Sequence, residues 1–99
     1  MMTRRDVFLR LQGLDEQFPI DFNDVDYCLR VRSLGLRVVF TPHALLYHHE
    51  SASFGPRRQG QAAIELMRQR WDRTIACDPY YHPDLSRVVD YRIRVGTAE

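Results

Sequence analysis

The stretch from Asn23 to Gly35 limits the fold of this chain more than any other part of its sequence. Its apolar side chains recur at the three- and four-residue spacing of one helix face: Tyr27, Val31 and Leu34, with Cys28 beside them. Asp21 or Asn23 provides a residue type that favours a helix start, and Gly35 favours the left-handed backbone that ends many helices. We therefore predict a helix over residues 23–34.

The segment before this helix predicts a second, shorter helix and an irregular connection. Residues 3–11 have an apolar side and begin with Thr3, a candidate N-cap, while Asp6 follows three residues later as in a capping box. Residues 14–20 have no regular period and contain Pro19, which indicates a loop. We expect this loop to be held by apolar anchors: Leu14, Phe18 and Ile20.

The segments after the central helix add strands and a third helix. Residues 36–40 and 44–48 are rich in β-formers and predict two short strands. Residues 50–60 have loop composition and are expected to be mobile, and residues 61–75 predict an amphipathic helix. Residues 87–99 form a tail in this interpretation. The predicted fold class is α+β, with three helices and a few short strands.

Length, charge, cysteine spacing and the length of the apolar runs argue against several classes of protein. A chain of 99 residues has room for one small domain at most. The 14 basic residues, all arginine, are balanced by 13 acidic residues, which argues against a dedicated nucleic-acid binder. The two cysteines lack metal-ribbon spacing, and no apolar run approaches the ~20 residues that a membrane-spanning helix needs.

Three groups of polar residues are candidates for chemistry, and each also has a plain structural interpretation. Asp24 and Asp26 stand in the first turn of the central helix, where acids are common and where a reachable carboxylate could also act as a general base. The histidines are candidate metal ligands, although they lack the spacing of known motifs: His43, His48 and His49. Arg57 and Arg58 could bind a diphosphate or simply face solvent.

Four ordered segments together resemble a known family. They are residues 13–18 (GLDEQF), 22–32 (FNDVDYCLRVR), 35–51 (GLRVVFTPHALLYHHES) and 78–86 (DPYYHPDLS). This order is similar to the C-terminal, acceptor-side half of family 2 glycosyltransferases of the GT-A fold. The last segment resembles the "DPYYNPNL" tail of bacterial members that build polysaccharides or modify cell-surface glycans.

The resemblance implies a role for each matching residue. Asp24 matches the catalytic base that deprotonates the acceptor hydroxyl during transfer from a nucleotide-sugar donor, so the implied activity is that of a hexosyltransferase. Asn23 and Asp26 match acceptor-side positions, of which Asp26 has the alternative task of holding the helix start. His48 matches a ligand of the divalent ion, Mg or Mn, and Arg57 with Arg58 match a loop near the donor diphosphate.

The resemblance covers only part of such an enzyme. The nucleotide-binding half with its D-x-D motif precedes this region in the family, so we interpret residues 1–99 as a single partial domain and expect little or no transfer by this chain alone. Apolar faces left without a partner predict self-association. The implied location is the cytoplasm or the inner face of its membrane.

Two other classes of function remain open from the residues. One is a non-catalytic interaction module, or remnant, that binds a partner through exposed apolar faces. The other is a small metal-binding protein in which Cys28 and the histidines converge.

Overall fold

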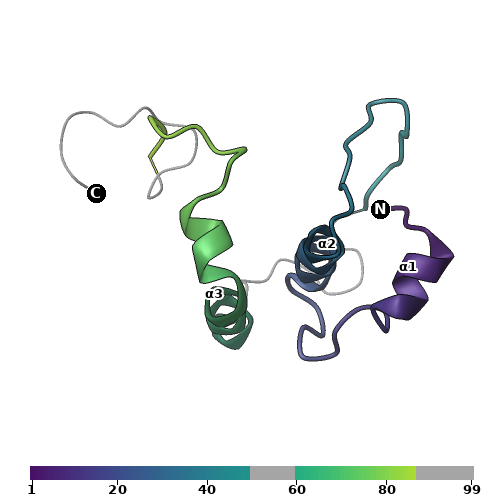
Figure 1. Cartoon of the computed structure of the whole chain (residues 1–99), viewed down its shortest axis with the longest axis horizontal. Coiled ribbons are helices and arrows are strands. Elements are labelled where there is room, and N and C mark those ends of the chain that lie inside the picture. Colours follow the sequence, from purple (N-terminus) through teal and green to yellow (C-terminus); the bar gives the residue numbers. More distant parts are fainter. Residues whose placement is uncertain (50–59, 87–99) are drawn as a thin grey trace.

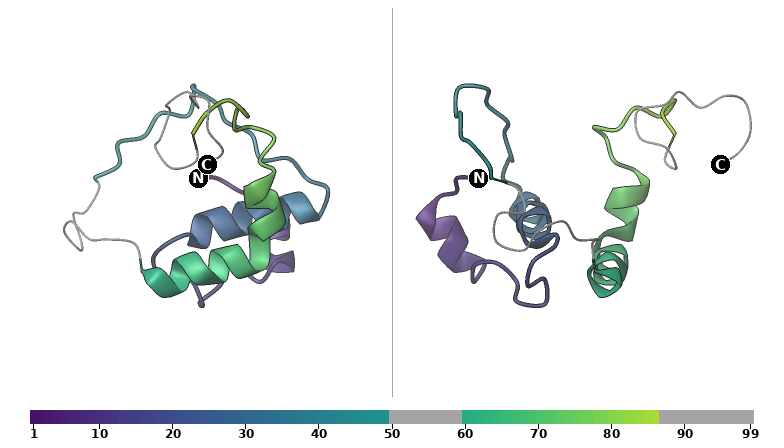
Figure 2. Two further views of the ribbon diagram at one scale, coloured as in Figure 1. Left: turned by 90° about the vertical axis from the view of Figure 1, so that its left-hand side faces the viewer. Right: turned by 180° about the vertical axis from the view of Figure 1, so that it is seen from behind.

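The computed structural model describes residues 1–49 and 60–86, which contain three helices. These are α1 (Arg5–Arg10), α2 (Asn23–Ser33) and α3 (Gln61–Ala76). In two views that differ by a half turn, α2 lies between α1 and α3 (Figures 1 and 2). Within the described ranges no helix has the length and apolar character needed to cross a bilayer.

Helix α1 is shorter at its start than the sequence predicts. Arg4, not Thr3, is the N-cap residue, and it provides no side-chain cap. The Thr3 hydroxyl instead lies 2.8 Å from the Tyr27 hydroxyl, so the prediction that Thr3 caps α1 is wrong. Asp6 accepts hydrogen bonds from the Arg4 guanidinium rather than completing a capping box.

Helix α1 ends in a left-handed turn that leads the chain toward α2. Gln12 and Gly13 both have positive φ angles, 60° and 75°. The Gly13 N–H donates to the Phe8 carbonyl at 2.9 Å and the Gln12 N–H to the Leu9 carbonyl at 3.1 Å, which is the paired bonding of a Schellman motif. The predicted stop at residues 12 and 13 is therefore confirmed.

The apolar contact between α1 and α2 is the main core of the described chain. Tyr27 and Val31 of α2 pack with Val7 of α1, as the periodicity predicts. Leu11 and Leu34 pack at the edge of this cluster. Gly35, with φ of 76°, follows the C-cap of α2, which confirms the predicted stop.

The loop before α2 contains one anchor instead of the three predicted. Phe18 is only 1% exposed, but Leu14 and Ile20 are exposed, so these two assignments are wrong. The Phe18 ring is covered by the Arg70 guanidinium of α3, whose central carbon lies 5.2 Å from the ring centroid. The loop therefore contacts α3 through this cation–π pair.

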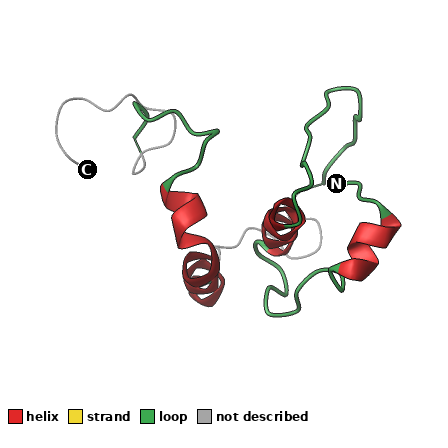
Figure 3. Cartoon of the chain, in the orientation of Figure 1, coloured by secondary structure: helices red, strands yellow, loops and turns green. Residues whose placement is uncertain are grey.

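The two predicted strands are not formed within the described ranges. Figure 3 shows residues 36–40 and 44–48 as loop, and Figure 1 shows them within an open segment that projects away from the helices. A strand needs a neighbour to pair its backbone N–H and C=O groups, and these residues have no ladder in the structure. The α+β class therefore stays a prediction, while all three predicted helices are present. Of the loop predicted at residues 50–60, only Gly60 is among the described residues, and the tail at 87–99 lies outside them.

Candidate functional site

The two acids of the first turn of α2 point in different directions. Positions two apart on an α-helix are separated by about 200° around the axis, so they do not share a face. Asp26 lies on the inner face and is 0% exposed, whereas Asp24 is exposed on the outer face. The same short motif thus supplies one buried and one accessible carboxylate.

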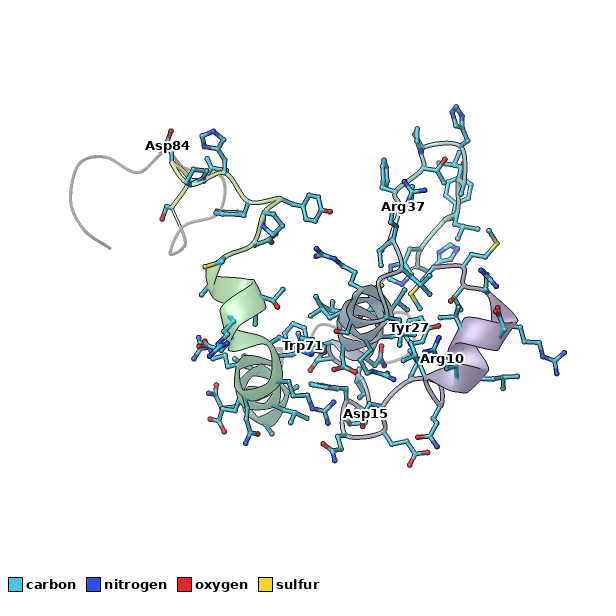
Figure 4. The ribbon with its side chains drawn as sticks, in the orientation of Figure 1. Arg10, Asp15, Tyr27, Arg37, Trp71 and Asp84 are labelled. Carbon is cyan, nitrogen blue, oxygen red and sulfur yellow. The ribbon has the colours of Figure 1, made fainter. Side chains whose placement is uncertain are left out.

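The buried carboxylate of Asp26 accepts hydrogen bonds from two helices. Arg30, one turn later on α2, donates from Nε to Oδ2 at 2.8 Å. From α3, the Trp71 indole Nε1 donates to Oδ1 at 3.0 Å, and Arg70 Nη1 lies 3.3 Å from the same oxygen. Figure 4 shows Trp71 directed from α3 toward α2. A buried charge requires such partners, since removing it from water is otherwise very costly.

The two arginines extend this cluster to the loop that follows α1. Arg30 donates to the carbonyl oxygens of Leu11 and Gly13, both at 2.9 Å. It therefore binds acceptors at the C-terminal end of α1, where the helix dipole favours a cation. Through Arg30, the buried carboxylate of α2 is connected to the end of α1.

Arg70 makes the matching connection on the other side. Its Nη1 donates to Asp15 at 2.7 Å and its Nη2 to Gln17 at 2.6 Å. The hydrogen bond to Asp15 is the main cause of a raised Arg70 pKa, and the bond to Asp26 adds to it. The Asp15 pKa is lowered, first by the backbone N–H of Gln17 and then by Arg70. We call the side chains of Asp15, Asp26, Arg30, Arg70 and Trp71 the Asp26 cluster.

Asp24 has the features that a general base needs. Its Oδ1 accepts a hydrogen bond from the Val25 N–H at 2.8 Å, which orients the group, and the side chain remains open to solvent. Asn23 precedes it at the first position of α2 and is half-buried. A hydroxyl group could approach Asp24 without displacing any buried residue.

Cys28 lies one helical turn after Asp24 and borders a cavity. The cavity has a volume of about 470 Å³ and lies between the N-terminal residues, α2 and the segment after α2; it is lined by Met1, Met2, Tyr27, Cys28, Val31 and Val38, among others. Burial raises the pKa of the Cys28 thiol, and the negative charge of Asp24 raises it further. The effect of Asp24 on Cys28 makes the thiol a local reporter of the carboxylate.

The other predicted site residues do not assemble around Asp24 into a metal centre. His43, His48 and His49 are exposed in the open segment after α2. Among the residues that the structure describes, no three histidine, cysteine or acidic side chains are close enough to hold an ion together. Arg57 and Arg58 lie outside the described residues.

The acceptor-binding role of Asp26 stays a prediction, and the burial of this side chain favours its alternative role. A side chain that is 0% exposed and bonded to three donors cannot reach a substrate without breaking the cluster. The alternative role, holding the start of the helix, agrees with the geometry.

The sequence did not lead us to predict Arg30 as part of this cluster, although its spacing of four residues from Asp26 was a visible signal. It did not indicate Arg70 and Trp71, because nothing local connects them to a residue 44 or 45 positions away.

Three curated proteins are similar to this chain. The uncharacterized protein y4gI of Sinorhizobium fredii is 38% identical over 93 residues, which is 87% of this chain and 10% of that protein. The O-antigen biosynthesis protein RfbC of Myxococcus xanthus is 39% identical over 88 residues, or 87% of this chain and 7% of that protein. The rhamnosyltransferase WbbL of Escherichia coli is 37% identical over 57 residues, or 54% of this chain and 22% of that protein.

By name, two of these relatives are a rhamnosyltransferase and a protein of O-antigen biosynthesis, which supports a relationship of the chain to glycosyltransferases. The chain spans between 7% and 22% of the length of these relatives. No protein-family profile matches it, and no solved structure does so at a significant level.

Proposed function

We propose that this chain is the acceptor-side part of a family 2-like glycosyltransferase of the GT-A fold, acting in polysaccharide or cell-surface glycan synthesis. The names of two relatives support the class of reaction and the biosynthetic setting. The observation that carries the proposal is the exposed carboxylate of Asp24 in the first turn of α2, a turn whose other acid, Asp26, is fully buried on the opposite face. A reacting hydroxyl needs this kind of accessible base on a rigid element.

In this proposal Asp24 is the general base for sugar transfer. The acceptor hydroxyl oxygen attacks the anomeric carbon of a nucleotide-activated hexose or deoxyhexose, and Asp24 takes the hydroxyl proton. The bond from that carbon to the diphosphate breaks, and the nucleotide leaves with the electron pair. Asn23, next to Asp24, would contact the acceptor, because it is the neighbouring polar side chain at the same helix end.

The described residues of this chain provide at most part of a metal site. A divalent ion, Mg or Mn, would offset charge on the leaving diphosphate. The described residues do not fit a complete site, since they contain no group of three potential ligands, and we assign no step to the ion. We propose His48 as the single ligand from this chain, and Arg57 with Arg58 as contacts of the donor diphosphate.

The open segment after α2 supports a second property, self-association. Five of its hydrophobic side chains are between 72% and 92% exposed: Val39, Phe40, Leu45, Leu46 and Tyr47. An apolar surface of this kind favours burial against a partner, and a second copy of the chain is the partner we propose. The same observation favours an interaction module as the alternative function. We place the working protein in the cytoplasm, including the inner face of the membrane.

The proposed function can be tested in the framework of a longer relative. The 88 aligned residues of the Myxococcus xanthus relative would be replaced by the matching residues of this chain. The chimera would then be expressed in a strain that lacks that relative, and O-antigen would be measured by gel. We expect O-antigen with the chimera and a loss of at least ~100-fold with Asp24→Asn, as removal of a general base typically costs 10²–10⁴-fold.

The control for this test is Asp72→Asn, which changes an exposed acid on α3. It should leave O-antigen at the level of the parent chimera. Full O-antigen with Asp24→Asn would refute the role of Asp24 as base. An inactive parent chimera that is folded and abundant would count against the assignment of the whole chain.

A further inference from the structure

The first turn of α2 lacks the usual means of fixing a helix start. Its N-cap residue is Phe22, which has a φ of 64° and offers no side-chain hydrogen bond. A bulky residue in the left-handed region is unfavourable, and capping residues normally carry a short polar side chain. Asp21, one of the two predicted caps with Asn23, uses its carboxylate to accept the Gly60 N–H at 2.9 Å, at the start of α3.

What holds this turn is the buried side of the helix. The Asp26 N–H donates to the Phe22 carbonyl at 2.8 Å, so the backbone at Asp26 closes the first turn. The Asp26 side chain is in turn bonded to Trp71 and Arg70 of α3. The place of the first turn is therefore set by contacts with residues 44 and 45 positions later in the chain.

Two residues of α3 contact the start of α2 and the loop before it. Arg70 binds Asp15 and Gln17 in the preceding loop as well as Asp26, so it fixes the loop and the helix start relative to each other. Trp71 interrupts the regular geometry of α3, with a φ of −123°, at the point where its indole meets Asp26. Both residues act from the face of α2 opposite to Asp24.

We propose that Trp71 and Arg70 are positioning residues that fix, through Asp26, the location of the Asp24 carboxylate. The inference rests on the proposed role of Asp24 as base. The contacts with α3 lie on the face of α2 opposite to Asp24, so they hold the first turn in place and leave the Asp24 carboxylate open to a substrate. A misplacement of a catalytic group by about 1 Å can cost a reaction roughly 100-fold, so such support is significant for rate.

Cys28 provides a test that does not depend on sugar transfer. The charged groups that act on this thiol are the Asp24 carboxylate, which raises its pKa, and the N-terminal amino group, which lowers it. Arg4 and Arg37 also line the cavity that Cys28 borders. With Cys77→Ser removing the other thiol, the Cys28 pKa can be measured from the pH dependence of alkylation in the full 99-residue chain.

Asp24→Asn should lower the Cys28 pKa, because it removes a nearby negative charge. The difference between the two pKa values, with and without Asp24→Asn, measures how closely the carboxylate is held to the thiol. We expect this difference to fall by at least half when Trp71→Phe removes the indole donor, and also with Arg70→Met. Arg70→Lys, which keeps a cation, should restore part of it.

The matched control is Arg68→Met, which changes an exposed arginine on the same helix. It should leave the difference unchanged. Circular dichroism checks that each variant is helical, and the two separate positions keep the test valid if one variant does not fold. An undiminished difference in both Trp71→Phe and Arg70→Met would overturn the proposal.

Failure of this inference is distinguishable from failure of the proposed function. If thiol titration supports positioning while the Asp24→Asn chimera still makes O-antigen, only the role of Asp24 as base is refuted. If Asp24→Asn abolishes O-antigen while the thiol difference is insensitive to Trp71 and Arg70, only the positioning role is refuted.

Discussion

Replacing the buried carboxylate with its isosteric amide, Asp26→Asn, should be far more damaging than the same change at Asp24. In wild type, Oδ1 of Asp26 faces the Trp71 and Arg70 donors and Oδ2 faces Arg30 Nε. An asparagine has only one acceptor oxygen, so in either orientation its NH₂ group meets a donor. The change also leaves Arg30 and Arg70 with less compensating charge in a site that is 0% exposed.

Breaking one partner of a buried charge cluster costs about 3–5 kcal/mol. We take the lower end, about 3 kcal/mol, because both arginines keep other acceptors. This is a large part of the roughly 5–15 kcal/mol that stabilises a domain of this size. With a urea slope of about 1.5 kcal/mol per molar, the unfolding midpoint should fall by about 2 M.

The assay is urea unfolding followed by the fluorescence of Trp71, the single tryptophan of the chain, whose indole is itself bonded to Asp26. Helicity measured by circular dichroism gives a second probe. Asp24→Asn is the matched control and should stay within about 0.5 kcal/mol of wild type, because the side chain is exposed. A loss of less than about 1 kcal/mol for Asp26→Asn would refute the view that this carboxylate organises the three helices.

Three further changes test other parts of the structure. The pKa of Asp15 is lowered in the folded state. Its carboxylate therefore contributes to stability above the unfolded pKa of about 3.9, and this contribution is lost as the pH falls through the folded pKa. Asp15→Asn should reduce the loss of stability below about pH 4, measured in acid-unfolding curves. Gly13→Ala should destabilise the chain by about 1–2 kcal/mol because of the positive φ. It should cost more than Gly35→Ala in thermal melts, since the new Cβ would lie 3.1 Å from the Phe8 ring while Gly35 has nothing within 4 Å. Phe40→Ser removes a side chain that is 88% exposed and should shift sedimentation profiles toward monomer; an unchanged profile would argue against self-association through this segment.

Local sequence signals were reliable where the cause of the structure is local. The three helices follow from apolar spacing, and both predicted helix stops follow from the residues at positions 12, 13 and 35, which adopt positive φ angles. The helix starts were less well predicted. Thr3 and Asp21 have the chemistry of caps, but each side chain bonds to a distant partner, Tyr27 or Gly60, because tertiary contacts compete with local capping.

The predicted strands show the limit of composition. Residues 36–40 and 44–48 carry β-forming side chains, yet strand formation depends on a neighbouring strand that supplies hydrogen bonds. Composition can indicate that a segment is suited to a β-sheet, but it does not show whether a neighbouring strand is present to pair with it. The exposed apolar side chains of this segment in the structure are the direct consequence.

By itself, the sequence determined that one helix would begin with two acids and that its apolar face would include Tyr27 and Val31, because helical periodicity is a property of neighbouring residues. It also indicated, through ordered motifs, a relationship to glycosyltransferases. Only the tertiary structure decided which acid is buried and which is exposed. That decision depends on Arg70 and Trp71, whose approach to Asp26 requires α3 to fold back against α2, and a contact over 44 or 45 positions leaves no local signal.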